Sequence, residues 1–290
     1  MNLSGSIAFQ SLRALDRCLP LSALAGVLGG LSSTANRMAR ESMVPPVDRF
    51  ERLAQFSDAF PVPNARQISR ERTLNRLDRM AACWPDRYRG EKWKQRCRID
   101  GLESLRELAK QKRPVVLPTF HFGPIFIQRY WLRAHDLPVA QLIHEDTATR
   151  SPFRREKDRL SGLEWPQVFC VNTELKEAAR WLKGGGMLIV PIDLPTARNL
   201  TVPAKNARLS LSTGFARLAA KHSAEVIPTL IRHTAPLEWQ IHLGPVWSSD
   251  ESQSKAEEDA LNHTVASLLP VLERNPEQFR GEFLDCIVDG

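Results

Sequence analysis

One histidine stands where an apolar, strand-like run meets the start of a helix. The run covers residues 114–120, His121 follows it directly, and Gly123 and Pro124 come next. Because proline suits the first turn of a helix, we expect a helix over residues 124–134. His121 would then lie at the carboxyl edge of a sheet and beside a helix N-terminus, where ligand crevices form and developing negative charge is stabilised. A histidine there can act as a general base, although a structural histidine fits the same position.

The motifs of several large enzyme classes are missing from the chain. It contains no GxSxG, GxxxxGK[ST], GxGxxG or HExxH pattern, so serine hydrolases, P-loop enzymes, Rossmann dehydrogenases and zincins lose their usual support. The 5 cysteines are scattered without a CxxC pair, which indicates neither a zinc site nor a disulfide framework. We therefore expect no metal and no redox cofactor.

Elements that position His121 are visible as short apolar runs separated by helix signals. Thr173 precedes a periodic segment, 174–183, that stops at three glycines, and a second helix is expected over 212–222. Strands that alternate with helices predict an α/β fold with a mainly parallel central sheet flanked by helices. The expected strands cover residues 114–120, 139–144, 167–171, 187–193, 225–233 and 239–246.

Helical patterns occupy both ends of the chain. The arginine-rich segment 68–84 predicts an amphipathic helix with a basic outer face, and residues 255–274 predict another amphipathic helix. We therefore expect an N-terminal helical, membrane-contacting region over residues 1–95 and an α/β domain over 96–290. The apolar stretch 19–31 is shorter than the ~20 residues that a spanning helix needs. An interfacial helix, a core helix and a spanning anchor all remain open for it.

Charge favours anionic partners without choosing among them. The formal net charge is +7 and the pI is about 9.4, which suits anionic lipids, nucleic acid or an acidic carrier protein. No aromatic platform or nucleic-acid motif accompanies the arginine-rich helix, so we expect no nucleic-acid partner.

Four ordered blocks carry a resemblance to a known family. "FHFGP" after "RPVVLPT" resembles the histidine block of the lipid A late acyltransferases, the lauroyl and myristoyl acyltransferases of the wider lysophospholipid acyltransferase superfamily. The segments "CRIDGLESLRELAKQKRP", "ELKEAARWLKGGGMLIVPIDLP" and "LTVPAKNARLSLSTGFARLAAKHSAEVIPTLIRH" are similar to further family blocks in the same order. "RNPEQF" has a counterpart near the family's C-terminus, so the resemblance covers about residues 96–283.

The resemblance implies a glycerolipid acyltransferase-like fold and an acyl-transfer reaction. His121 would act as general base on a hydroxyl or amine of a lipid or lipid-like acceptor, and backbone amides near the helix start would steady the oxyanion. The acyl thioester of acyl carrier protein or coenzyme A would be the co-substrate, with no other cofactor. Phe122, Gly123 and Pro124 would contact substrate, and Gly123 would let the backbone approach the acyl group. The resemblance places such a protein at the cytoplasmic face of a bacterial inner membrane, peripheral or held by a single N-terminal anchor.

The chain departs from the family at the partner of the histidine. The family has Asp or Glu five positions after it, where this chain has Phe126, and Gln128 could hydrogen-bond the ring without neutralising an imidazolium. Three explanations compete. Another carboxylate replaces it, first Asp193 and then Glu145 or Asp146; His121 acts alone with reduced efficiency; or the protein is an inactive relative that binds lipid or acyl chains.

A second departure concerns the basic residue that the family tends to carry in a Tyr-Arg-Pro pattern after its next strand. The corresponding residues here are 143–146, which read Ile-His-Glu-Asp. Arg150, Arg154 or Arg155 could bind acceptor phosphates instead, although each also fits a solvated helix face. The acceptor could therefore differ from lipid A.

Overall fold

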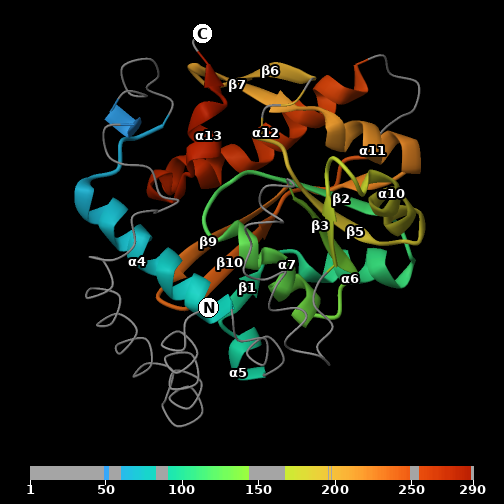
Figure 1. The fold of residues 1–290 in the computed structure, drawn as a ribbon, viewed down its shortest axis with the longest axis horizontal. Coiled ribbons are helices and arrows are strands. Elements are labelled where there is room, and N and C mark those ends of the chain that lie inside the picture. Colours follow the sequence, from blue (N-terminus) through green and yellow to red (C-terminus); the bar gives the residue numbers. More distant parts are fainter. Residues whose placement is uncertain are drawn as a thin grey trace.

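The computed structural model describes residues 49–51, 60–82, 91–143, 167–194, 196, 198–248 and 255–288. Its core is a five-stranded sheet in which all neighbouring strands are parallel, in the order β4-β3-β5-β2-β8 (Figure 1). These strands are β2 (Val115–Thr119), β3 (Val139–Ile143), β4 (Gln167–Cys170), β5 (Met187–Pro191) and β8 (Glu225–Val226). The predicted α/β fold with a mainly parallel sheet is confirmed.

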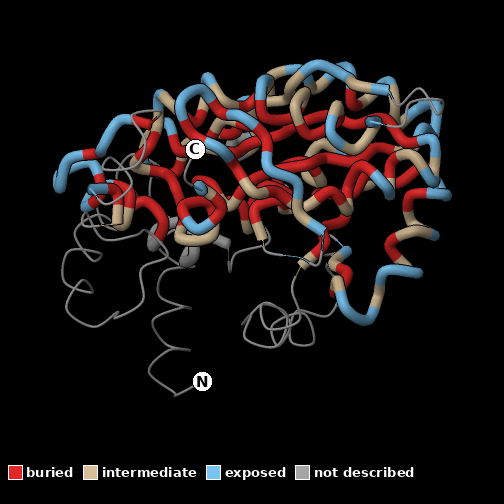
Figure 2. Tube along the Cα trace, turned by 90° about the horizontal axis from the view of Figure 1, so that it is seen from above, coloured by how far each residue is buried: buried red, intermediate tan, exposed pale blue. Residues whose placement is uncertain are grey.

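Helices cover both faces of this sheet. The α10 helix (Leu175–Lys183), α11 (Gly214–His222) and α12 (Ala256–Arg274) pack on one face, and α6 (Leu102–Lys110) and α7 (Ile125–Ala134) pack on the other. Residues of β2 alternate between the two cores, with Val116 in the first and Val115 and Leu117 in the second. Burial on both faces explains why the strand sequences are continuously apolar. Figure 2 shows the buried residues running through the middle of the molecule.

The apolar run over residues 225–233 is two strands rather than the single strand that the sequence predicts. β8 ends at Val226 in the central sheet, and β9 (Thr229–Ala235) begins a different sheet. Pro228 lies between them, and proline lacks the N–H that a sheet ladder requires. β9 pairs antiparallel with β10 (Glu238–Leu243), which in turn pairs parallel with β1 (Cys97–Ile99). The predicted strand over 239–246 thus belongs to this smaller sheet.

A β-hairpin follows β5, where the sequence analysis expected no strands. It is formed by β6 (Asn199–Ala204) and β7 (Ala207–Ser212), and β11 (Ile287–Val288) pairs with the other side of β7. Pro203 lies on the outer strand of this sheet, a position that tolerates proline. The backbone of Ser212 donates to the carbonyl of Ile192, which ties the hairpin to the end of β5.

The described residues include further helical elements. They are α4 (Ala65–Ala82), α5 (Glu91–Lys94), the 3₁₀ helix η2 (Pro276–Gln278) and α13 (Gly281–Asp285). α4 is the basic helix predicted from the sequence, and it packs against η2 with Ile68 and Leu74 buried. Across the described residues, no helix combines the length and apolar character needed to span a bilayer. The stretch 19–31 lies outside the described residues, and the division between residues 95 and 96 stays a prediction.

Candidate active site

His121 and Asp193 are brought together by two adjacent parallel strands. β2 and β5 pair in a register that sets Thr119 opposite Pro191. His121 lies two residues after Thr119, and Asp193 lies two residues after Pro191. The N–H of Ile192 donates to the Thr119 carbonyl at 2.9 Å, which continues the ladder beyond the strand ends. Both residues therefore leave the sheet at the same carboxyl edge, where open α/β folds place their ligands.

The carboxylate of Asp193 binds His121 at two points. One oxygen accepts the backbone N–H of His121 at 2.6 Å, and the other lies 2.7 Å from Nδ1 of the ring. An ionised carboxylate only accepts hydrogen bonds, so Nδ1 carries the proton and Nε2 of the neutral ring is left with its lone pair. Within the described part of the chain, no group hydrogen-bonds Nε2. The imidazole is thus oriented for a base that works through Nε2.

Burial and charge act on His121 in opposite directions. Burial disfavours the imidazolium, but the carboxylate of Asp193, through its charge and its hydrogen bond, more than offsets this and raises the pKa of His121 above its ordinary value. Glu282 adds to the rise and Arg280 opposes it. The His121 side chain keeps 16% of its surface exposed, whereas that of Asp193 has none. A proton taken up by the ring is therefore stabilised while one edge of the ring still reaches solvent.

Gly123 is required by the packing of the loop behind the histidine. Its φ is +51°, and a Cβ there would lie 2.3 Å from the carbonyl oxygen of Ile231 in β9. Its N–H donates to the carbonyl of Gln278 at 2.9 Å, so this amide is not available to an oxyanion. The close approach that the glycine permits is to β9, and its approach to an acyl group stays a prediction.

Phe122 and Pro124 occupy different environments. The Phe122 side chain is fully buried and packs against Phe279, with ring centroids 5.9 Å apart, so it belongs to the core and not to a substrate-facing surface. Pro124 is the residue before α7. Among the described residues, the first two N–H groups of α7, on Ile125 and Phe126, have no hydrogen-bond partner, as at most helix starts.

Of the other predicted partners of the ring, only Gln128 lies in the described residues, and it does not contact His121. Gln128 points to β9, where its amide donates to the Thr229 hydroxyl at 2.7 Å, so it does not bind His121. Phe126 packs at the edge of the apolar core between α7 and the sheet. Glu145, Asp146, Arg150, Arg154 and Arg155 lie outside the described residues.

The residues that follow α12 hold the histidine loop in place. The N–H of Arg280 donates to the His121 carbonyl at 3.1 Å, and Phe279 forms a β-bridge with Phe122. The guanidinium of Arg280 donates from Nε to the carbonyl of Gly123 at 2.9 Å. The loop is therefore attached on one side to Asp193 and on the other to the residues that follow α12.

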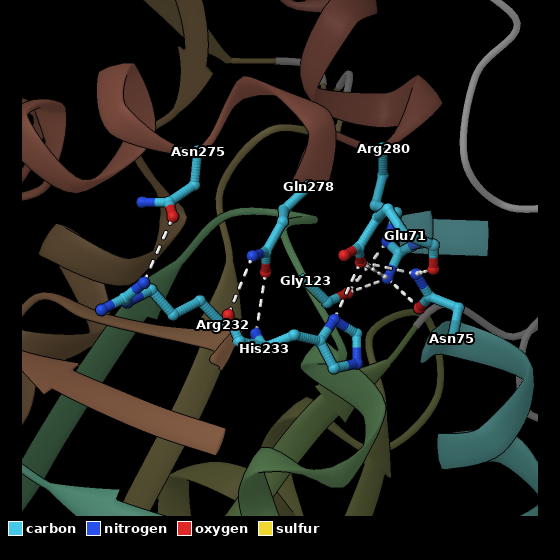
Figure 3. A network of polar contacts seen from close by, with 8 residues as sticks. All are labelled: Glu71, Asn75, Gly123, Arg232, His233, Asn275, Gln278 and Arg280. Atoms are coloured by element: carbon cyan, nitrogen blue, oxygen red, sulfur yellow. Dashed lines mark hydrogen bonds and ion pairs between the residues drawn. The ribbon is translucent and has the colours of Figure 1, made fainter. Parts of the chain in front are cut away.

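Sequence reasoning missed this second group of residues. Gln278 and Arg280 hold the loop, and Glu71, Asn75 and His233 surround Arg280 (Figure 3). The "RNPEQF" segment at 274–279 was the available signal, because it is polar and yet follows a long amphipathic helix. No local pattern connects it to Glu71, which is more than 200 residues away along the chain.

Comparison with known proteins agrees with this architecture. The family described as "Bacterial lipid A biosynthesis acyltransferase" matches residues 78–280, which include His121, Asp193 and Arg280. The chain belongs to this family. Membership makes the protein an acyltransferase of the lipid A type and confirms the resemblance inferred from its sequence blocks. Glu71 and Asn75, which contact Arg280, precede this span.

Other comparisons add less. A solved structure, the 1-acyl-sn-glycerophosphate acyltransferase PlsC from Thermotoga maritima, is similar over 85% of this chain and 95% of its own, with 14% identity and a TM-score of 0.39. At this low identity and TM-score, no functional role is inferred from the similarity. No curated protein matches the chain.

Proposed function

We propose that this acyltransferase moves a fatty acyl group from an acyl thioester to a hydroxyl or amine of a lipid or lipid-like acceptor, with His121 as general base and Asp193 as its orienting carboxylate. The observation that carries the proposal is the two-point contact between Asp193 and His121 at the carboxyl edge of the sheet. Family membership supports the reaction class. Acyl carrier protein and coenzyme A are the two candidate donors, and no metal or redox group has a part in the scheme.

The geometry supports a conventional acyl-transfer cycle. Nε2 of His121 removes the proton of the acceptor as the acceptor oxygen or nitrogen attacks the thioester carbonyl. The resulting imidazolium is stabilised by Asp193, which stays ionised and holds the ring in place. Collapse of the tetrahedral intermediate breaks the carbon–sulfur bond, and the departing thiolate takes the proton from His121. The products are the acylated acceptor and the free thiol, and the base is regenerated.

The oxyanion of the intermediate needs hydrogen-bond donors close to His121. The amides of Phe122 and Gly123 are already bound to the carbonyls of Phe120 and Gln278. We assign the task to the unpaired N–H groups at the start of α7, which point along a helix dipole that favours negative charge.

We also propose that the enzyme works at a membrane surface, with the outer face of α4 toward anionic headgroups. Arg66 and Arg70 lie one helical turn apart and are exposed, while Ile68 and Leu74 of the same helix are buried. The whole chain carries a formal charge of +7. Basic residues near an anionic surface each contribute about 1 kcal/mol of attraction. Peripheral contact at the cytoplasmic face of a bacterial inner membrane is the arrangement we favour.

The test is a comparison of acylated lipids and lipid-like metabolites in four cell lines. They carry the wild type, His121→Ala, Asp193→Asn, or no copy of the gene. We expect one acylated product to vanish in the cells without a copy and in the His121→Ala cells, and to fall strongly with Asp193→Asn. If all four profiles are the same although loss of the gene has a phenotype, the reaction is wrong and the protein is a binding relative of the family.

A further inference from the structure

A buried polar network lies beneath the histidine loop and connects it to α4 (Figure 3). Glu71 and Asn75 enter it from α4, His233 from β9, and Gln278 and Arg280 from the segment after α12. All five residues are at most 6% exposed. Burying ionisable groups is costly unless they are paired, so such a network requires an explanation.

Arg280 is the centre of the network. Its Nη2 donates to the side-chain oxygen of Asn75 and to the carbonyl of Gly123, and its Nε donates to the same carbonyl at 2.9 Å. The guanidinium lies 3.9 Å from the carboxylate of Glu71, which neutralises it. Two N–H groups of one planar guanidinium thus converge on a single backbone oxygen in the histidine loop, a geometry that lysine cannot reproduce.

The partners of Arg280 are themselves fixed. Glu71 lies 2.9 Å from Nδ1 of His233 and accepts from the Asn75 amide at 2.7 Å. The side-chain amide of Gln278 pairs with both backbone groups of His233, at 2.9 and 3.1 Å. The carbonyl of Gln278 then accepts the N–H of Gly123. Both backbone groups of Gly123 are consequently held by residues of this segment.

We propose that Arg280 is a positioning residue for His121: through the carbonyls of His121 and Gly123 it fixes the loop that aims the imidazole at Asp193, and Glu71 on α4 holds the guanidinium in place. The inference rests on the proposed function, in which His121 is the base. Arg280 itself touches neither the ring nor the reacting atoms in this scheme. Its effect reaches the reaction only through the distance and angle between His121 and Asp193.

The deciding variant is Arg280→Lys, which keeps the buried positive charge and removes the pair of hydrogen bonds from the guanidinium to the carbonyl of Gly123. Around His121 the charged groups are Asp193, Glu282 and Arg280 itself, and this variant changes none of their charges. If the loop loosens, the contact with Asp193 weakens and the pKa of His121 falls toward its ordinary value. Histidine labelled at Cε1 reports that pKa by NMR titration of the full chain in detergent micelles, with His121→Ala to assign the signal among 7 histidines.

Kinetics on the same samples supply the second readout. The probe is thiol release from palmitoyl-coenzyme A in the presence of vesicles made from bacterial total lipid extract. We expect the kcat of Arg280→Lys to fall by about ten- to a hundredfold, the size of effect that a small misplacement of a catalytic group causes, with KM nearly unchanged. The matched control is Arg180→Lys, because Arg180 pairs with Glu177 on the surface and its side chain is 73% exposed. That variant should match the wild type.

A second variant keeps the inference testable if Arg280→Lys does not fold. Asn75→Ala removes one acceptor of the guanidinium and alters no charge, so it should lower the pKa of His121 and kcat in the same direction but less. If the folded fraction of both variants keeps the wild-type kcat and His121 pKa while only the melting temperature drops, Arg280 is structural and the inference is overturned. If His121→Ala retains thiol release, the proposed function fails instead, and the NMR titration still decides whether Arg280 positions the ring.

Discussion

Among the described residues, two histidine–carboxylate pairs occur, and their surroundings differ. In the first, Nδ1 of His121 lies 2.7 Å from Asp193; in the second, Nδ1 of His233 lies 2.9 Å from Glu71. The His121 side chain is 16% exposed, whereas that of His233 is 1% exposed and stands beside the Arg280 network. The same local contact therefore holds a solvent-reaching histidine in one place and a fully packed histidine in the other.

A short contact between a histidine and a carboxylate therefore does not identify an active site by itself. Within the described residues, what distinguishes His121 is its place at the carboxyl edge of the parallel sheet, an Nε2 without a hydrogen-bond partner and a side chain that reaches solvent. His233 lies within β9, and its backbone is paired to the Gln278 side chain. Accessibility and backbone context decide which of the two pairs can do chemistry.

Replacing each histidine by alanine is the strongest test of this contrast. We expect His121→Ala to reduce kcat/KM by about 10⁴-fold, the upper range for a general base, with little change in melting temperature. His233→Ala should instead lower stability, because it leaves the buried carboxylate of Glu71 without one of its partners. Thiol-release kinetics and thermal melts of both variants provide the measurement. A His233→Ala protein that keeps its melting temperature but loses activity would contradict the assignment.

Glu71→Gln tests the buried pair of His233 and Glu71 by changing its carboxylate. The substitution removes the carboxylate that neutralises Arg280 and leaves a buried cation, which costs about 3 kcal/mol of folding free energy. Urea unfolding should show a lower midpoint with the same slope. Glu177→Gln is the control, since Glu177 forms an exposed pair with Arg180 and should change stability little. Equal effects in the two variants would mean that the network adds nothing to the fold.

Asp193→Asn separates the orientation of His121 from its presence. An amide at this position no longer stabilises the imidazolium and can reverse the ring's tautomer, so we expect kcat to fall by about 10⁴-fold. Wild-type activity should decline as pH falls through the raised pKa of His121, because the imidazolium cannot accept a proton. In Asp193→Asn that acidic limb should move to lower pH, since the pKa drops when the carboxylate charge is lost. An unmoved limb would show that Asp193 does not set the basicity of His121.

The smallest expected effect concerns the surface of α4 opposite the buried Glu71. The double substitution Arg66→Gln and Arg70→Gln should weaken binding to anionic vesicles by about 2 kcal/mol at low salt and leave binding to neutral vesicles unchanged. Co-sedimentation with phosphatidylglycerol and phosphatidylcholine vesicles measures this. Melting temperature should not change, because both arginines are exposed. Unaltered sedimentation with anionic vesicles would remove α4 from the membrane contact.

The sequence alone indicated the local elements and a candidate base, His121. Apolar runs between helix signals predicted the strands of the central sheet, and the histidine, glycine and proline after β2 predicted a site at its carboxyl edge. The family blocks gave the reaction class, which the match over residues 78–280 confirms. The predictions of the central sheet and of the family succeeded because they depend on periodicity and on short motifs that neighbouring residues specify, and the site stays a prediction.

Only the tertiary structure decided which strands are neighbours. Asp193 follows β5, and the strand order sets β5 rather than β3 beside β2, so its carboxylate reaches His121. The Arg280 network was likewise invisible, because its partners lie far apart along the chain, whereas the break at Pro228 has a local signal in the proline itself. The contact between Glu71 and His233 likewise joins segments that are distant along the chain. Contacts between distant segments depend on strand order and helix docking, which no local pattern encodes.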